Sequence, residues 1–132
     1  MISLTKGVLD LIIAHAKKDL PNEACGYLAG RDGVVSLSYI LTNIDHSPEH
    51  FSFDPAEQFQ AVKDARSKGL QILANYHSHP VTPSRPSQED IRLAFDPDIS
   101  YIIISLADVV PVVKSFQIVN GLVTNEEIII TE

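Results

Sequence analysis

The chain has 132 residues, of which 45% are hydrophobic and 20% are charged, which predicts one globular domain over residues 1–132 and excludes a disordered chain. Its formal net charge of −7 argues against a nucleic-acid partner, because such proteins usually carry a basic patch. The single cysteine, the lack of a signal-peptide pattern and the lack of any apolar run of roughly 20 residues predict a cytoplasmic protein without a membrane partner.

The N-terminal third predicts a short strand, a helix and a β-hairpin. The strand is Ile2–Leu4, after which Thr5 can cap a helix that reaches about Asp19. The residues expected on the buried face of this helix recur at helical spacing: Val8, Leu11, Ile12, His15 and Ala16. The hairpin strands Ala24–Gly30 and Val34–Thr42 flank an Asp-Gly pair, which favours a tight turn.

A polar loop, a short strand and a second helix are expected next. The loop covers Asn43–Glu49 and the strand covers Phe51–Phe53. Asp54 is an N-cap candidate followed by proline and, three positions after the cap, by glutamate, which together indicate a strong helix start. This helix is expected to end near Lys68, because Gly69 follows it.

The second half is rich in strands. Leu70–His77 predicts an apolar strand, and the proline-rich segment Val81–Pro86 cannot form regular structure. The remaining expected elements are a short helix at Ser87–Phe95, a central strand at Tyr101–Leu106, and a hairpin of Val112–Val119 with Leu122–Ile130 around Asn120-Gly121. This order predicts an α/β fold in which helices flank a mixed β-sheet, and not a doubly wound sheet.

The segment His77-Ser78-His79-Pro80 carries the clearest chemical signal in the chain. Residues two apart on a strand point to the same face, so both imidazoles can converge on one ion. Asp90, in the first turn of the next helix, can add a carboxylate oxygen. Two histidines and one carboxylate leave a fourth position for water, as in catalytic zinc sites. We therefore predict one zinc ion per chain, with a bound water.

Each part of this site also has an ordinary structural interpretation. A His-x-His pair on a strand is weak evidence for metal by itself. Ser87 and Asp90 have the spacing of a capping box, in which Asp90 only satisfies the helix terminus. On this view one carboxylate oxygen cannot serve both a backbone N–H and a metal ion.

The full pattern resembles the JAMM/MPN+ (Mov34/PAD-1) metallopeptidases. Their signature is a distant glutamate, then His-Ser/Thr-His-Pro, six residues, and Ser-x-x-Asp, and every position matches here. The distant glutamate corresponds to Glu23, two positions before Cys25-Gly26. The resemblance implies a JAMM/cytidine-deaminase-like sandwich, with His77, His79 and Asp90 as metal ligands. It also implies Glu23 as general base and Ser87 as a donor to the oxyanion.

The absence of long insertions makes the chain similar to compact prokaryotic members of that family. Several of those act on ubiquitin-like sulfur-carrier proteins with a Gly-Gly C-terminus. The resemblance thus implies a peptidase or isopeptidase that acts at the tail of such a partner, without fixing the bond or the oligomeric state. Within the site, Ser78 is expected to face away and Pro80 to fix the turn. Cys25 is expected to be a small buried residue and not a nucleophile.

Two other functions are open at this stage. Many relatives in the wider family lack the ligands and serve as non-catalytic interaction scaffolds, and a metal-binding scaffold is the main alternative. A RadC-like protein is disfavoured by the negative charge and by the serine between the two histidines. Among the remaining histidines, His15 is expected to be packed on the buried face of the first helix, whereas His46 and His50 could border a substrate groove.

Overall fold

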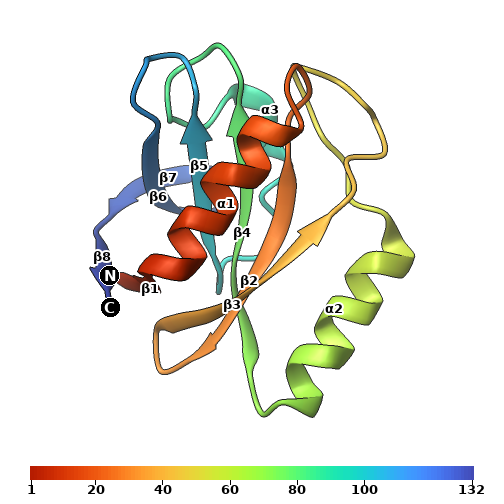
Figure 1. Cartoon of the computed structure of the whole chain (residues 1–132), viewed down its shortest axis with the longest axis vertical. Helices are drawn as coiled ribbons and strands as arrows, with labels where there is room; N and C mark the ends of the chain where they lie inside the picture. The colour runs from red at the N-terminus through yellow and green to blue at the C-terminus, as the bar shows by residue number, and fades with distance from the viewer.

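The computed structural model describes residues 1–132, which form eight strands and three helices (Figure 1). In chain order these are β1 (Ile2–Thr5), α1 (Lys6–Lys18), β2 (Cys25–Arg31), β3 (Val34–Leu41), α2 (Pro55–Ser67), β4 (Gln71–His79), α3 (Gln88–Arg92), β5 (Ser100–Ser105), β6 (Val112–Val119), β7 (Leu122–Glu126) and β8 (Ile128–Thr131). The strands form one sheet in the order β7-β6-β5-β4-β2-β3-β1-β8. β4 pairs parallel with β5, and β1 pairs parallel with both β3 and β8, while the other pairs are antiparallel. The predicted α/β class with a mixed sheet is confirmed.

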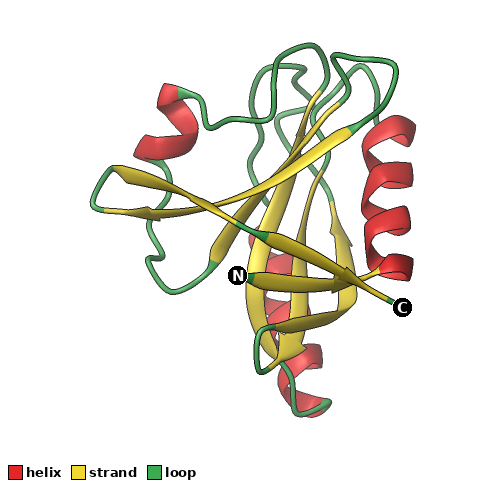
Figure 2. Cartoon of the chain, turned by 90° about the vertical axis from the view of Figure 1, so that its left-hand side faces the viewer, coloured by secondary structure: helices red, strands yellow, loops and turns green.

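The two edge strands of this sheet, β7 and β8, are consecutive in the chain and separated only by Glu127. The sheet is strongly twisted (Figure 2), and the Ile2 N–H donates to the Glu127 carbonyl at 3.0 Å. The prediction of one strand over Leu122–Ile130 is therefore wrong. The first part pairs with β6, and the last part crosses to the other edge to pair with β1.

The two faces of the sheet are packed differently. On one face, α1 covers an apolar cluster that includes Ala74 and Tyr76 of β4 (Figure 2). Because side chains alternate along a strand, Asn75, His77 and His79 point to the opposite face. That face holds a smaller cluster with Ile103 of β5, and α3 lies over it. The alternation along β4 thus separates the main core from the polar residues of interest.

Three expectations about the elements are wrong in detail. Leu11 is 54% exposed, because it lies to one side of the buried stripe through Val8 and Ile12. α3 ends at Arg92 rather than at Phe95, which is exposed. The segment Phe51–Phe53 makes only an isolated bridge, between Phe53 and Asn43, instead of a strand. None of the helices is long and apolar enough to cross a membrane.

Candidate metal centre and active site

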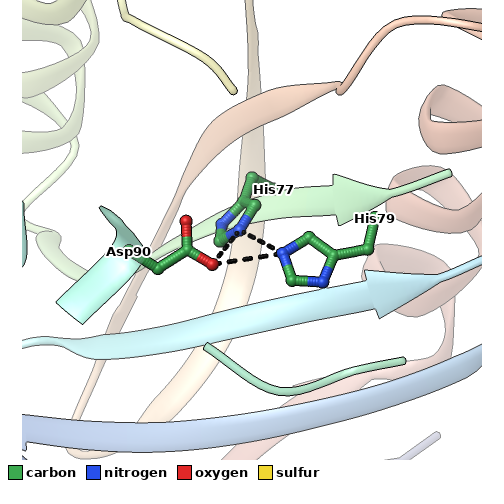
Figure 3. Close-up of side chains that lie close together, drawn as sticks. All are labelled: His77, His79 and Asp90. Atoms are coloured by element: carbon green, nitrogen blue, oxygen red, sulfur yellow. Dashed lines mark hydrogen bonds and ion pairs between the residues drawn. The ribbon is translucent and has the colours of Figure 1, made fainter. Parts of the chain in front are cut away.

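Three predicted ligands converge between the end of β4 and the first turn of α3 (Figure 3). The Nε2 atoms of His77 and His79 are 3.1 Å apart. They lie 3.2 Å and 3.1 Å, respectively, from Oδ2 of Asp90. Both imidazoles are buried, with 3% and 5% of their residue surface exposed. Oδ2 of Asp90 and the Nε2 atoms of His77 and His79 thus form a nearly equilateral triangle.

This triangle has the size and chemistry that a zinc ion requires. Metal–ligand bonds of about 2.05 Å in a tetrahedral site place neighbouring ligand atoms about 3.3 Å apart. The three separations here fall within about 0.2 Å of that value. Two imidazole nitrogens and one carboxylate oxygen are also a common donor set of catalytic zinc. The residues therefore fit the ion.

The ring of His79 is fixed from behind by the proline-rich loop. Its Nδ1 lies 2.8 Å from the carbonyl oxygen of Pro83. A carbonyl only accepts, so Nδ1 carries the proton and Nε2 presents a lone pair toward the triangle. The loop itself is held by β5, because Ser105 Oγ donates to the Thr82 carbonyl at 2.6 Å. The proline-rich loop, which has no regular secondary structure, is thus anchored to β5 and orients the His79 ring.

Asp90 is both a helix cap and a member of the triangle. The Ser87 N–H donates to Asp90 Oδ2 at 2.9 Å, and the Asp90 N–H donates to Ser87 Oγ at 3.0 Å. The capping oxygen is therefore the one that faces the histidines. The expectation that one oxygen could not serve both roles is wrong, because a carboxylate oxygen has two lone pairs. The cap orients Asp90 rather than competing for it.

The pKa shifts of His77 and Asp90 favour the forms that bind a metal ion, whereas the shift of His79 favours its protonated form. Burial lowers the pKa of His77, which keeps its imidazole neutral. Burial acts in the same direction on His79, but hydrogen bonds to Asp90 and to Pro83 raise its pKa overall. Burial opposes ionisation of Asp90, yet its bonds to the two histidines hold the pKa of its carboxyl well below the usual range. The carboxylate is thus ionised at neutral pH.

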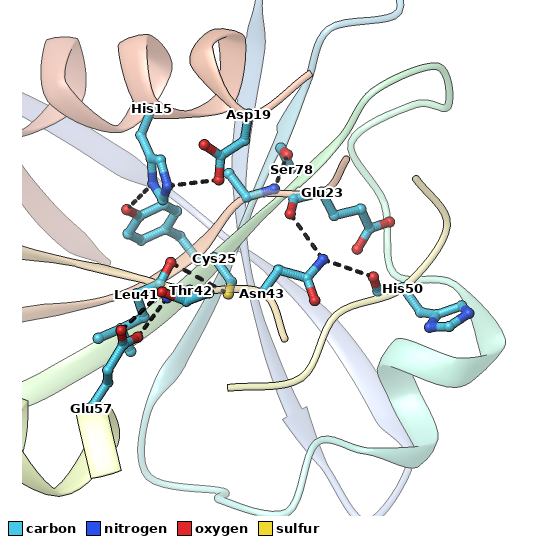
Figure 4. A network of polar contacts seen from close by, with 12 residues as sticks. His15, Asp19, Glu23, Cys25, Leu41, Thr42, Asn43, His50, Glu57 and Ser78 are labelled. Carbon is cyan, nitrogen blue, oxygen red and sulfur yellow. Dashed lines mark hydrogen bonds and ion pairs between the residues drawn. The ribbon is translucent and has the colours of Figure 1, made fainter. Parts of the chain in front are cut away.

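Glu23 provides a second carboxyl group near the ligands His79 and Asp90, and one of its oxygens is buried without a hydrogen-bond partner. Only 4% of its surface is exposed, and its Oε1 has no hydrogen-bond partner. Burial raises its pKa to about 8, with the His79 charge acting in the opposite direction. Its main chain is fixed by Ser47, whose carbonyl accepts from the Glu23 N–H, and by Asn43, whose amide donates to the Glu23 carbonyl (Figure 4). The main chain of Glu23 is thus anchored, while its buried carboxyl has a raised pKa and no hydrogen-bond partner at Oε1.

Residues 5–119 match the family model described as prokaryotic homologs of the JAB domain. The chain belongs to this prokaryotic JAB family. The predicted resemblance to compact prokaryotic JAMM/MPN+ proteins is thereby confirmed.

Several relatives of this JAB-family chain have names or structures. The CysO-cysteine peptidase of Mycobacterium tuberculosis is 36% identical over 133 residues, which cover 95% of this chain and 88% of the relative. The desampylase of Haloferax volcanii is 32% identical over 111 residues, which cover 79% of this chain and 80% of the relative. A protein of Desulfitobacterium hafniense with a known solution structure is 58% identical, with a TM-score of 0.92 over 100% of this chain and 94% of its own.

The other residues singled out in the sequence occupy supporting places in the JAB-family fold. Ser78 Oγ accepts from the Ala24 N–H at 2.8 Å, on the face away from the triangle. Cys25 is buried, and burial raises the pKa of its thiol to about 12, so it is a poor nucleophile. His15 lies on the buried face of α1, with Nδ1 2.7 Å from the Tyr76 hydroxyl. His46 and His50 do not line the cleft beside the ligands.

That cleft has a volume of about 380 Å³ and opens beside His77 and Asp90. Its floor includes a row of three residues in register across three strands: Tyr27 of β2, Asn75 of β4 and Tyr101 of β5. Its walls come from α3 on one side and from the segment before α2 on the other. The cleft leads from the triangle along the sheet surface.

Two residues of the site were not found from the sequence. The ring of Phe51 stacks on the His77 imidazole, with centroids 4.6 Å apart and an interplanar angle of 26°. Asn43 joins the Glu23 main chain to the loop, because its amide nitrogen also lies 3.1 Å from the His50 carbonyl oxygen. Each residue contacts a partner more than 15 positions away along the chain, so no local pattern could indicate these contacts.

Proposed function

We propose that this JAB-family protein is a zinc-dependent peptidase. Its substrate would be the peptide or isopeptide bond that follows the C-terminal tail of a ubiquitin-like, sulfur-carrier-type protein. The observation that supports this most strongly is the triangle of His77, His79 and Asp90 beside the buried, unpartnered carboxyl of Glu23. The relative named a CysO-cysteine peptidase supports a carrier-type substrate.

The ligands assigned to zinc are His77, His79 and Asp90. Zinc in such a site acts as a Lewis acid and lowers the pKa of water towards about 7. The capping box and the Pro83 carbonyl keep the ligand atoms aimed at one point before any ion binds. This preorganisation removes the cost of ordering the ligands during binding.

Glu23 is assigned the role of general base and then general acid. It accepts a proton from the attacking water and later delivers it to the leaving amine. A base works best when its pKa is close to the working pH, and burial brings Glu23 into that range. Its main chain is anchored by Asn43 and Ser47, which supports a fixed starting point for the side chain through both transfers.

Ser87 is assigned the role of oxyanion donor. Its Oγ accepts the Asp90 N–H, which uses a lone pair and leaves the hydroxyl hydrogen free to donate. A hydroxyl held in this way can stabilise the negative charge that develops on the carbonyl oxygen. The same side chain therefore orients a ligand and contributes to the chemical step.

The experiment is incubation of the zinc-loaded protein with ubiquitin-like carriers that bear C-terminal extensions after Gly-Gly, read by intact mass. We expect the extension to be released by the wild-type chain and not by Glu23→Gln, with zinc retained in both. Asp10→Asn, a change on the exposed surface of α1, is the control that should cleave normally. Zinc binding without cleavage of any carrier would contradict the peptidase and favour a metal-binding scaffold.

A further inference from the structure

The cleft beside the metal centre lies at a defined distance from the ligands. Asn75 precedes His77 by two residues on the same face of β4, so the floor row lies about 7 Å from the ligand along the strand. An extended peptide advances about 3.3 Å per residue, so this distance corresponds to two residues of a bound tail. For a tail that runs along β4, a side chain in the cleft belongs to a residue two positions from the scissile one.

The position of Glu23 indicates which side of the scissile bond occupies the cleft. In the proposed function, on which this inference rests, Glu23 gives its proton to the leaving amine. The leaving group must therefore lie on the Glu23 side of the metal, and Glu23 does not line the cleft. The acyl side of the substrate then extends over the floor row. In a tail that ends in Gly-Gly, the residue two positions before the scissile glycine is the first one with a side chain.

The lining of the cleft selects a particular kind of side chain. Aromatic rings of Tyr27, Phe51 and Tyr101 provide apolar walls and π faces. Asp96 adds negative charge, as does Glu89, which also forms an exposed ion pair with Arg92 at 3.6 Å, and no lysine or arginine lines the cleft. An apolar stem with a cationic head satisfies both the aromatic faces and the acidic groups.

Asn75 supplies a specific acceptor on the floor of the same cleft. Its Oδ1 is buried and has no hydrogen-bond partner. A buried acceptor without a partner is unfavourable, and a bound donor would relieve that cost. Lysine and arginine heads carry only donors, which matches an orphaned acceptor better than a hydroxyl or a carboxylate does.

We propose that this cleft binds a lysine or arginine side chain located two residues before the scissile glycine of the substrate tail. Asn75 is then a specificity-determining residue and accepts a hydrogen bond from the basic head. The acidic groups at the cleft discriminate against a glutamate or aspartate at the same tail position. Zinc and Glu23 perform the chemistry, while the floor row selects the tail.

The test compares carriers whose tails end in Arg-Gly-Gly, Leu-Gly-Gly or Glu-Gly-Gly before the same extension. For the zinc-loaded chain we expect kcat/KM for the arginine tail to exceed that for the leucine tail about tenfold, with the glutamate tail lowest. Asn75→Leu should abolish the arginine preference, so that the arginine and leucine tails are cleaved with similar kcat/KM. Asn125→Leu makes the same change on exposed β7 and should keep the preference. Moving the arginine one position in either direction should also abolish it.

A binding measurement separates failure of the cleft from failure of the proposed function. Calorimetry of the three tail peptides with Glu23→Gln in zinc should give the same order of affinity without turnover. If the arginine tail binds but the wild type does not cleave it, the result supports the cleft as the site for a basic side chain and contradicts the proposed peptidase activity. The cleft assignment is overturned if cleavage and binding do not depend on this tail residue, or depend only on the residue after the scissile bond. It is also overturned if none of the peptides binds.

Discussion

Replacement of Glu23 by glutamine should make the metal-free protein more stable at alkaline pH, although a charged group is lost. Burial raises the pKa of Glu23 from 4.5 to about 8, so the folded state holds its proton over a range where the unfolded state has released it. The unfolded state then binds fewer protons, and stability falls as pH rises through this window. Glutamine stays neutral, so Glu23→Gln does not suffer this loss.

The size of the effect follows from the two pKa values. Between pH 5 and pH 8 the titration of Glu23 should remove about 3–4 kcal/mol from the free energy of unfolding of the wild type relative to the variant. The chain has no tryptophan, so urea unfolding in a chelator is followed by far-ultraviolet circular dichroism at several pH values. A difference between the two proteins that does not change with pH would refute the assignment of Glu23 as a buried, desolvated acid.

Four further outcomes are expected. Ser87→Ala should lower kcat about 10²–10³-fold by loss of the oxyanion donor, and should cost about 1 kcal/mol of stability by loss of the cap, measured by urea unfolding; normal turnover would remove Ser87 from the mechanism. Asp90→Asn should lower zinc affinity at least tenfold in a competition with a chelating dye. Gly26→Ala should destabilise the fold by about 1–3 kcal/mol in urea unfolding, because its Cβ would collide with the Tyr39 carbonyl and the Tyr76 ring. Phe51→Ala should weaken zinc binding by freeing the His77 ring, and unchanged affinity would show the stacking to be incidental.

Local patterns were sufficient to predict most of the elements and the ligand triangle. The period-two alternation of β4 puts His77 and His79 on one face, and the spacing to Ser87 and Asp90 gives a helix start at the right distance. Both signals depend on residues that are close in sequence. The positions of His77, His79, Ser87 and Asp90 therefore followed from short motifs, whereas Glu23 was indicated only by the resemblance to the family signature.

Features that depend on long-range packing were not predicted. The crossing of the chain after Glu126 is set by pairing of β8 with β1, more than 120 residues earlier, and nothing in the local sequence of Leu122–Ile130 indicates it. Phe51 was assigned to a short strand, whereas the structure has only a bridge at Phe53 and the Phe51 ring stacks on His77. The double use of Asp90 Oδ2 also appeared only once the cap and the histidines were seen together.

X-ray absorption spectroscopy at the zinc edge tests the central claim of a zinc centre held by His77, His79 and Asp90 most directly. For the loaded wild type we expect one zinc per chain, with only nitrogen and oxygen scatterers at about 2.0–2.2 Å and an imidazole pattern that weakens in His77→Ala. Cys25 should make no contribution, because its thiol is buried and protonated. A sulfur scatterer at about 2.3 Å, or a spectrum unchanged in His77→Ala, would contradict the account.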